Sequence, residues 1–383
     1  MTSLTIKAMP GLSGVDPHAW DALANPPGAE RDPFLSWAFL EALEASGCVG
    51  DATGWLPRHL LAEDEDGRLL GAMPLYAKTH SMGEYVFDHA WADAYERAGG
   101  RYYPKLLTAI PFTPVTGRRL LSPDADVRRA LIDGARQLTG QWGVSSWHVN
   151  FPSAADREAL NGAGLLARTD RQFIWENRGY HTYDDFLADL SSRKRKALKK
   201  ERREAQDGIE IERLSGGDLS PAHWDVFFAC YQETGSRKWG SPYLNREFFD
   251  LVHQRIADDI LMVMAKHDGR YIAAALNFVG SDALYGRYWG RLEDRPALHF
   301  ELCYHQGIEF AIERGLSRME SGAQGEHKLA RGFRPKAVHS AHFIADPGFR
   351  AAVADYLERE REAVEYEIAA IDAESPFKAN SAG

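Results

Sequence analysis

The sequence predicts an α+β protein made of two copies of one unit, and two observations support this prediction. The chain of 383 residues is longer than a single hydrophobic core usually grows, so two domains are expected. The order of predicted elements also repeats along the chain. Each half is predicted to contain two helices and then a strand hairpin, with the turns Asp66-Gly67-Arg68 and Asp268-Gly269-Arg270 in equivalent places.

Hydrophobic periodicity places the elements of each copy. In the first copy we expect a short strand, two helices and two strands, at 4–8, 17–23, 34–46, 59–62 and 69–76. In the second copy we expect two helices and two strands, at 221–234, 245–257, 261–266 and 271–279. The segments 134–147 and 307–319 then correspond to each other, because each reads as a helix that ends near glycine and leads into a strand.

The junction between the copies is expected within 165–180, because 171–176 already has the pattern of a first strand. We therefore predict an N-terminal domain at 1–168 and a C-terminal domain at 169–383. The second domain also receives a basic helix and a last helix, at 191–205 and 349–368. Short helices, a mixed and mainly antiparallel sheet, and then a further helix and strand resemble the acyl-CoA N-acyltransferase fold called GNAT. The predicted fold class is α+β, with two tandem GNAT-like domains.

Composition limits the function classes. The net charge of −10 argues against non-specific binding of nucleic acid by the molecule as a whole, although a local basic patch can still bind an anion. Cys48, Cys230 and Cys303 lie far apart, which argues against a disulfide framework and a cysteine zinc site and fits a reducing cytoplasm. We expect no membrane-spanning segment, because no apolar run approaches the roughly 18 residues required.

The first candidate for chemistry is the basic run at 191–205. Its cations can face phosphate groups from one helix, and we single out Arg193, Lys196, Lys200 and Arg203 as an anion or donor site. A solvated linker helix with no ligand is the alternative interpretation, because runs of charge are often only exposed.

The second candidate is the aromatic and acidic segment at 83–105. It has the composition of a polar ligand pocket, so we expect substrate-binding roles for Asp88, Trp91, Asp93, Tyr95, Tyr103 and Lys105. The alternative is that 84–87 is a strand whose aromatic side chains fill the core.

The third candidate is the stretch from 285 to 333, in which we expect a strand at 283–289, a helix at 297–314, a strand at 317–320 and a loop at 321–333. Acyl transfer to an amine needs a base and groups that stabilise the developing oxyanion. Candidates for base and cation are Glu320, Glu326, His327, Lys328 and Arg334. The alternative is a glycine-rich connection whose charges are only solvated.

The strand before this helix adds Arg287, Tyr288 and Trp289 as substrate-binding candidates, although Tyr288 and Trp289 can equally be core residues. Regular alternation would put Arg287 and Trp289 on one face. No metal is expected, because the histidines and glutamates of the following helix lack the HExxH spacing. The sequence also lacks GxSxG, GxxxxGK[ST] and GxGxxG motifs, which removes the simplest hydrolase, nucleotidase and dinucleotide interpretations.

Three segments give a family resemblance that covers nearly the whole chain. They are GEYVFDHAWADAYERAGGRYYPKLLTAIPFTPVTGRRLL at 83–121, SSRKRKALKKERREA at 191–205, and YGRYWG with HFELCYHQGIEFAIERGLSRMESGAQGEHKLARGF within 285–333. These segments resemble the FemAB-like group of the GNAT superfamily, which is often labelled peptidoglycan biosynthesis or recognition.

The resemblance implies a cytoplasmic acyl- or aminoacyltransferase that acts on an amine of an envelope precursor. It also implies an aminoacyl-tRNA as a donor and partner, with acyl-CoA as the alternative donor and no permanently bound cofactor. The basic helix lies where Fem proteins carry a basic helical region, so donor contact there is implied. One departure is the segment 291–297, RLEDRPA, which lacks the glycines of the pyrophosphate loop of acetyl-CoA enzymes.

The resulting hypothesis places the acceptor between the segment 88–105 and the strand 287–289, with Glu320 or His327 as the base and Lys328 or Arg334 countering charge. An acetyl-CoA-dependent N-acetyltransferase with an atypical pyrophosphate site is the second hypothesis. A non-catalytic protein that recognises a cell-wall fragment or tRNA is the third.

Overall fold

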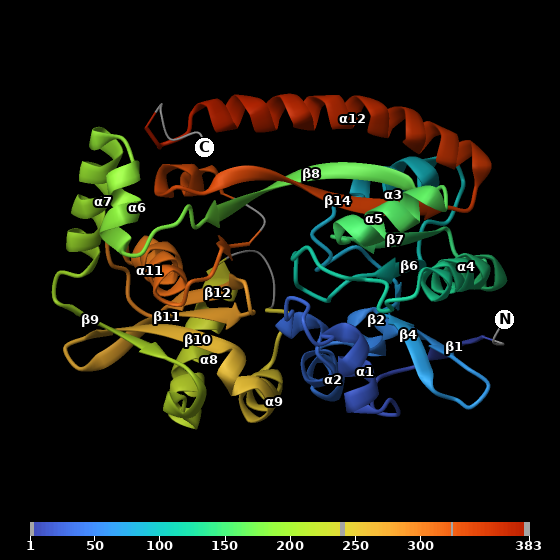
Figure 1. Ribbon diagram of the computed structural model, residues 1–383, viewed down its shortest axis with the longest axis horizontal. Coiled ribbons are helices and arrows are strands. Elements are labelled where there is room, and N and C mark those ends of the chain that lie inside the picture. Colours follow the sequence, from blue (N-terminus) through green and yellow to red (C-terminus); the bar gives the residue numbers. More distant parts are fainter. Residues whose placement is uncertain (1–3, 238–241, 323–324, 379–383) are drawn as a thin grey trace. The chain divides into compact units, whose positions relative to one another are not determined.

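The computed structural model of the protein describes residues 4–237, 242–322 and 325–378 (Figure 1). It divides into two compact units. Unit 1 consists of Met1–Asp170 and Ala337–Tyr366, and unit 2 consists of Arg171–Lys336 and Glu367–Gly383. The chain first passes from unit 1 to unit 2 after Asp170, which is close to the predicted domain boundary at residue 168. The sequence, however, assigned all of 169–383 to the C-terminal domain, whereas the structure returns 337–366 to unit 1.

Strand pairing explains this return of the chain. Strand β14 (Arg334–Ile344) pairs antiparallel with β7 (Ser146–Asn150), with Ser340 opposite Asn150 and Ile344 opposite Ser146. The pairing satisfies backbone groups that would otherwise be buried without partners. Its two strands lie far apart in the sequence, so the local hydrophobic pattern contains no sign of it.

The described part of unit 1 has strands in two sheets and five α-helices that lie wholly within the unit. The helices are α1 (Pro17–Ala24), α2 (Trp37–Ala45), α3 (His89–Arg97), α4 (Ala125–Trp142) and α5 (Ala154–Gly162). The smaller sheet has the order β1-β3-β4, from Thr5–Met9, His59–Glu63 and Leu69–Met73. In the larger sheet, the consecutive strands β2-β5-β6-β7-β14 belong to this unit, and β2, β5 and β6 are Trp55–Pro57, Tyr76–Lys78 and Lys105–Thr108. Strands β6 and β7 are parallel, and the other pairs that are described are antiparallel.

Unit 2 has a similar order of helices and strands, and its strands are neighbours in one sheet. Its strands run in the order β9-β10-β11-β12-β13-β8, from Ile209–Leu214, Ile260–His267, Arg270–Val279, Ala283–Arg291, Arg318–Glu320 and Leu166–Glu176, the last of which enters unit 2 at Arg171. Its helices are α6 (Tyr183–Asp189), α7 (Ser192–Ala205), α8 (Pro221–Arg237), α9 (Arg246–Ile256), α10 (Leu298–Phe300) and α11 (Gln306–Glu313). Strands β12 and β13 are parallel, as β6 and β7 are in unit 1. The predicted mixed and mainly antiparallel α+β organisation is therefore confirmed.

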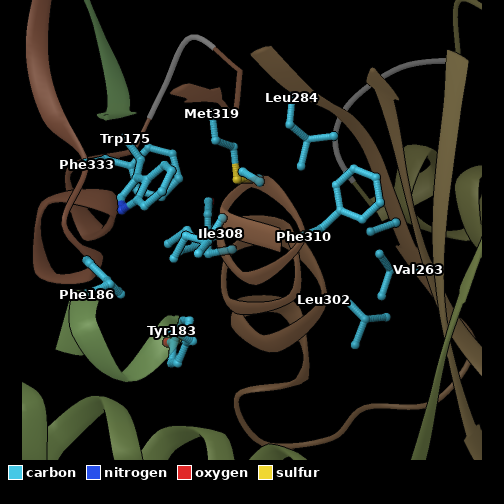
Figure 2. Close-up of a cluster of buried hydrophobic side chains, with 14 of the residues drawn as sticks. Trp175, Tyr183, Phe186, Val263, Leu284, Leu302, Ile308, Phe310, Met319 and Phe333 are labelled. Atoms are coloured by element: carbon cyan, nitrogen blue, oxygen red, sulfur yellow. The ribbon is translucent and has the colours of Figure 1, made fainter. Parts of the chain in front are cut away.

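The core of unit 2 forms around the helical stretch that begins at α10 and ends with α11. Figure 2 shows Ile308 on the side of Trp175 and Phe310 on the side of Leu284, so this stretch is apolar on more than one side. Both residues belong to one cluster of buried side chains. The helix is consequently fixed by packing and can hold polar side chains at its ends in defined positions.

Several predicted elements have different bounds in the structure. The segment 84–87 is a loop and not a strand, and the predicted strand at 69–76 is divided between β4 and β5. The predicted loop at 321–333 contains a 3-10 helix at Glu326–Arg331. The last helix, α12, is Pro347–Ala373 and thus extends beyond the predicted 349–368 at both ends.

Candidate functional site

In unit 2, strand β12 extends beyond the part that pairs with β13. The parallel pairing is limited to three residue pairs, from Ala283 with Arg318 to Tyr285 with Glu320, whereas β12 continues to Arg291. The part of β12 that does not pair with β13 still pairs with β11, and it contains a β-bulge. In this bulge Gly286 is opposite Asn277 and Tyr288 is opposite Leu276. Arg287 is the extra residue of this bulge, which interrupts the regular alternation that we used to place Arg287 and Trp289 on one face.

Lys328 lies in the 3-10 helix that follows β13, and its side chain is almost fully buried, with 1% exposed. Its ammonium donates to the carbonyl of Gly322 at 2.7 Å. Burial, together with the charge of Arg287, lowers the pKa of Lys328 to about 8. No carboxylate among the described residues forms an ion pair with this ammonium.

His327 lies at the exposed side of the same 3-10 helix. Its Nε2 is 2.9 Å from the hydroxyl of Tyr304. Burial raises the pKa of Tyr304, so this hydroxyl keeps its proton. In the tautomer protonated at Nε2, the Tyr304 oxygen accepts from Nε2–H, and Nδ1 is the ring nitrogen without a proton. We call the set formed by Lys328, Arg287, His327 and Tyr304 the Lys328 site.

Aromatic side chains surround His327. The ring centroids of Phe300 and His299 are 5.7 Å and 6.1 Å from that of His327, and the ring of His299 is in turn 5.1 Å from that of Trp289. The Arg331 guanidinium lies over Phe300, 3.4 Å from the ring centroid. Flat rings beside cations can hold a planar or partly apolar group of a substrate.

The other predicted catalytic residues differ in their surroundings. Glu320 is 7% exposed and accepts from Nε of Arg318 at 3.1 Å. Arg334 donates to Asp372 from two guanidinium nitrogens, so its charge is paired with the last helix of the chain. The side chain of Glu326 lies outside the part of the structure that is described.

A buried carboxylate joins α7 to the helical stretch 298–313. Glu301 is fully buried, at the start of a π-helical segment (Glu301–His305), and it accepts from Arg202, Gln206 and Gln306. Arg202 also donates to Glu309 at 2.8 Å. Buried charges need such complete pairing, so this network fixes one face of the basic helix.

The predicted anion-binding residues lie on the other face of α7. Arg193, Lys196, Lys200 and Arg203 are all exposed, and their spacing of three, four and three residues aligns them along one side of the helix. We call them the basic stripe. None of the four forms an ion pair with any described residue, whereas their neighbour Lys199 pairs with Asp184 at 3.2 Å.

The segment between β12 and α10 is not shaped as a glycine-rich phosphate loop. Arg291 pairs with Asp294, and Arg295 donates to Glu293 at 2.7 Å. Both arginines are therefore occupied by carboxylates of the same segment. This arrangement speaks against a pyrophosphate site of the acetyl-CoA type in unit 2.

In unit 1 the structure brings together two of the substrate-binding residues predicted there. The Lys105 ammonium is fully buried and donates to Ser81 at 2.7 Å, to Glu84 at 2.7 Å and to Asp88. A second buried lysine, Lys78, has its ammonium 3.9 Å from Glu84 Oε1. We call these five residues the ionic cluster.

The electrostatics of the ionic cluster are uneven. Burial acts against the charge of Lys105, but Glu84 and Asp88 outweigh it and raise the pKa of this lysine. Burial also acts against the charge of Asp88, yet Lys105 and His148 hold the pKa of Asp88 well below its usual range. In contrast, burial lowers the pKa of Lys78 to about 7 and raises the pKa of Glu84 to about 7.

Of the remaining predicted residues of unit 1, Tyr103 contacts this cluster, and the others have different surroundings. Tyr103 bonds through its hydroxyl to Ser81 at 2.8 Å. Trp91 is a core residue, 5% exposed, and its ring centroid is 4.9 Å from that of His342. Tyr95 stacks on Phe349 at 4.5 Å, and Asp93 is exposed.

The sequence interpretation missed several polar residues of both units. In unit 1 these are Lys78, Ser81, Glu84, His148 and His342. The two histidines continue a chain of hydrogen bonds that begins with Asp88 and Tyr102, two residues of the predicted pocket segment. In unit 2 the missed residues are Tyr304 and Cys303, the second of which acts electrostatically on Lys328. Ser81 and Glu84 lie just before Asp88 in the sequence, so their closeness to this polar segment could have indicated them. Lys78 is the last residue of strand β5, and no sequence pattern indicated its role.

The class of protein follows from the fold of the two units. Each unit contains a parallel strand pair, β6 with β7 or β12 with β13, within an otherwise antiparallel arrangement. Solved structures share this architecture, so the chain has two tandem GNAT-like units, as its sequence predicts. The chain belongs to the FemAB-like family, described as peptidoglycan biosynthesis/recognition, whose model matches residues 11–379.

Three solved structures illustrate the similarity of fold. FemX aligns with a TM-score of 0.56 at 13% identity, over 89% of this chain and 98% of FemX. The C-terminal domain of a putative lysylphosphatidylglycerol synthetase from Agrobacterium fabrum aligns with a TM-score of 0.53 at 10% identity, over 89% of this chain and 95% of that domain. L-PGS from Bacillus licheniformis aligns with a TM-score of 0.50 at 12% identity, over 86% of this chain and 98% of L-PGS.

No curated protein sequence matches this chain. Among the described residues, no group of three or more His, Cys, Asp or Glu side chains is arranged to hold a metal ion. Within the same described ranges, no helix has the length and apolar character needed to span a membrane.

Proposed function

We propose that the protein transfers an acyl group, in particular an aminoacyl group, to an amine of a cell-envelope precursor. Membership of the FemAB-like family supports this proposal. The observation that carries it is the Lys328 site, in which a buried ammonium without a carboxylate partner among the described residues lies near Arg287.

In this proposal Lys328 stabilises the oxyanion that forms when the amine attacks the acyl carbonyl. A cation in a site that excludes water stabilises developing negative charge more strongly than a solvated cation does. Lys328 has no carboxylate neighbour, among the described side chains, that would neutralise it in the ground state. Its charge is thus available to the transition state.

His327 is the proposed base that removes the proton from the attacking ammonium. Its imidazole is exposed, and one ring nitrogen is held by the Tyr304 hydroxyl at 2.9 Å. A hydrogen bond to one ring nitrogen fixes the orientation of the other. Glu320 remains the second candidate, although Arg318 already donates to its carboxylate at 3.1 Å.

The basic stripe is the proposed contact for the donor. Four aligned and exposed cations suit a row of phosphates, which favours an aminoacyl-tRNA over acyl-CoA. The paired arginines Arg291 and Arg295 also argue against the acyl-CoA alternative, because they leave no phosphate loop before α10.

Mass spectrometry of reaction products tests the proposed transfer. Purified protein is incubated with an amine-bearing peptidoglycan precursor and either a mixture of charged tRNAs or acetyl-CoA. We expect an aminoacylated product, and Lys328→Met should lower its rate by roughly 10²-fold, the usual effect of losing one oxyanion-stabilising group. Lys336→Met is the matched control, because this lysine is 39% exposed and pairs with Glu176 at 2.8 Å. Absence of product with either donor, or full activity of Lys328→Met, would contradict the proposal.

Salt dependence tests the donor assignment separately. Replacing all four stripe residues by glutamine should weaken tRNA binding and reduce the slope of log affinity against log salt by about 3–4. An unchanged slope would show that the basic stripe does not bind the donor. This result would not affect the role proposed for the Lys328 site, which the product assay tests separately.

A further inference from the structure

The two lysines of the ionic cluster lie directly opposite each other in the sheet of unit 1. Lys78, in β5, and Lys105, in β6, are partners in the antiparallel ladder, and both side chains are fully buried. Like charges directly opposite in a ladder destabilise it, and buried charges are costly unless they are compensated. The sheet therefore places two lysine side chains opposite each other inside unit 1, where their charges need compensation by other groups.

The carboxylates of the cluster both come from one loop and not from the sheet. The loop at 81–88 supplies Glu84 and Asp88. Asp88 is anchored, because it also accepts from the Tyr102 hydroxyl at 2.7 Å and lies at the start of α3. Glu84 is the carboxylate that approaches both lysines, with Oε2 on Lys105 and Oε1 toward Lys78.

Glu84 compensates Lys78 incompletely. The 3.9 Å between the Lys78 ammonium and Oε1 is too long for a hydrogen bond, and Oε1 is buried without a hydrogen-bond partner among the described residues. Lys78 contacts instead the Met82 carbonyl at 3.3 Å, His80 at 3.4 Å and the face of Trp55 at 3.7 Å. These neutral groups leave much of its charge uncompensated.

The backbone on both sides of Glu84 has an unusual conformation, and its carbonyls accept from Phe112 N–H (Gly83 carbonyl, 3.2 Å) and from Asn150 Nδ2 (Glu84 carbonyl, 3.2 Å). Gly83 and Tyr85 both have positive φ, at 78° and 60°, and this conformation costs a non-glycine residue such as Tyr85 free energy. The large apolar residues Met82 and Phe87 of the same loop are more than half exposed. The outer side of the loop is thus exposed to solvent, whereas Ser81 and Glu84 on its inner side are buried.

We propose that Lys78 and Lys105 form an oxyanion-binding site, and that Glu84 occupies the place of the external carboxylate or phosphate group in the closed loop. A ligand oxyanion displaces Glu84 and bridges the two ammonium groups, while Asp88 stays on Lys105. This site is independent of the Lys328 site and does not depend on the proposed acyl transfer.

Chemical rescue of Glu84→Ala tests the proposal directly. This substitution removes the carboxylate and leaves room for a small anion between the two lysines. We expect sodium phosphate or sodium acetate to raise the Tm of Glu84→Ala by about 2–4 °C above sodium chloride of the same ionic strength, as binding to the folded state alone requires. The relative effect of phosphate and acetate shows which oxyanion the site accepts. The double variant Lys78→Met/Glu84→Ala is the matched control and should show no rescue.

The wild-type protein gives a second measurement that needs no variant to fold. Chymotrypsin cleavage after Tyr85 and Phe87, followed by mass spectrometry, reports how often the 81–88 loop opens. Phosphate or acetate should accelerate this cleavage relative to chloride of equal ionic strength. If neither anion rescues Glu84→Ala, or if neither changes wild-type cleavage in the loop, then Glu84 is a permanent counter-ion and the proposal is wrong. If Glu84→Ala does not fold in any buffer, Glu84→Gln replaces it and should bind the same anion at least about tenfold more tightly than wild type, a difference of ~1.4 kcal/mol.

Discussion

The two units each bury a lysine, but they surround it in opposite ways. In unit 1, Lys105 is enclosed by Ser81, Glu84 and Asp88, and its charge is compensated several times over. In unit 2, Lys328 has the carbonyl of Gly322 and a nearby arginine, without a carboxylate partner in the described part of the chain. A buried charge that is paired contributes to structure for as long as its counter-ions stay in place, whereas one that is unpaired is directly available to a ligand or a reaction.

The largest difference between the two lysines should appear when each is replaced by methionine. Lys105→Met leaves two buried carboxylates without their cation, so we expect a loss of about 3–5 kcal/mol in the free energy of unfolding. Denaturant titration measures this loss. Lys7→Met is the matched control, because Lys7 pairs with Glu63 while its side chain is 52% exposed, and it should cost about 0–1 kcal/mol. Equal losses in both variants would remove the distinction between a buried and an exposed pair.

Lys328→Met should increase the free energy of unfolding at neutral pH, in contrast to Lys105→Met, which should lower it. The pKa of this lysine falls from 10.5 to about 8 on folding, so the folded protein carries an unfavourable charge below pH 8. Removing the charge should stabilise the protein there by up to roughly 3 kcal/mol. Between pH 8 and 10.5 the unfolded chain holds this proton and the folded chain does not, so wild-type stability should rise with pH and the advantage of Lys328→Met should disappear. Urea titrations of both proteins across this range measure the difference, and a constant difference would show that Lys328 is not perturbed.

Glu84→Gln should reveal a smaller pH dependence of stability, below pH 7. There wild-type stability should fall with rising pH, whereas the contribution of Lys328 makes it rise between pH 8 and 10.5. The pKa of Glu84 rises from 4.5 to about 7 on folding, so the folded protein holds this proton in a range where the unfolded chain has lost it. Wild-type stability should therefore fall by about 1–3 kcal/mol, relative to Glu84→Gln, as the pH rises from 4.5 to 7. Thermal unfolding of both proteins at matched ionic strength measures the slope. If the stability of wild type relative to Glu84→Gln rose or stayed constant from pH 4.5 to 7, Lys105 and Lys78 would keep Glu84 ionised over this whole range.

The sequence predicted the fold more completely than the sites, for a physical reason. Turns such as Asp268-Gly269 and the periodic apolar residues of α2 and α9 are local signals, and they were enough for two α+β units. The ionic cluster depends on the cross-strand pairing of Lys78 with Lys105, which no local pattern encodes. Lys105 and Asp88 were nevertheless found, because polar residues concentrated in one segment are visible without knowledge of the pairing.

Lys328 was also predicted from a local signal, the mixture of glycine and charge at 321–333. Its burial depends on the 3-10 helix at Glu326–Arg331, and its nearness to Arg287 depends on the bulge in β12. Neither feature has a sequence signature of its own. The same limit applies to Arg334, which is a cation of that stretch but pairs with Asp372 of the last helix.

The smallest effect on stability is expected when residues of the basic stripe are replaced. The two faces of α7 should therefore differ in how much their charged residues contribute to the free energy of unfolding. Each of Arg193, Lys196, Lys200 and Arg203 is exposed, so its replacement by glutamine should change the free energy of unfolding by less than about 0.5 kcal/mol. Arg202→Met on the opposite face is the matched control. It leaves the fully buried Glu301 without its cation and should cost about 3–5 kcal/mol. Urea titration of the four single variants and the control measures this contrast. A large loss from any stripe residue would mean that its charge supports the fold, so that its exposure to a ligand could no longer be argued from its position on the helix.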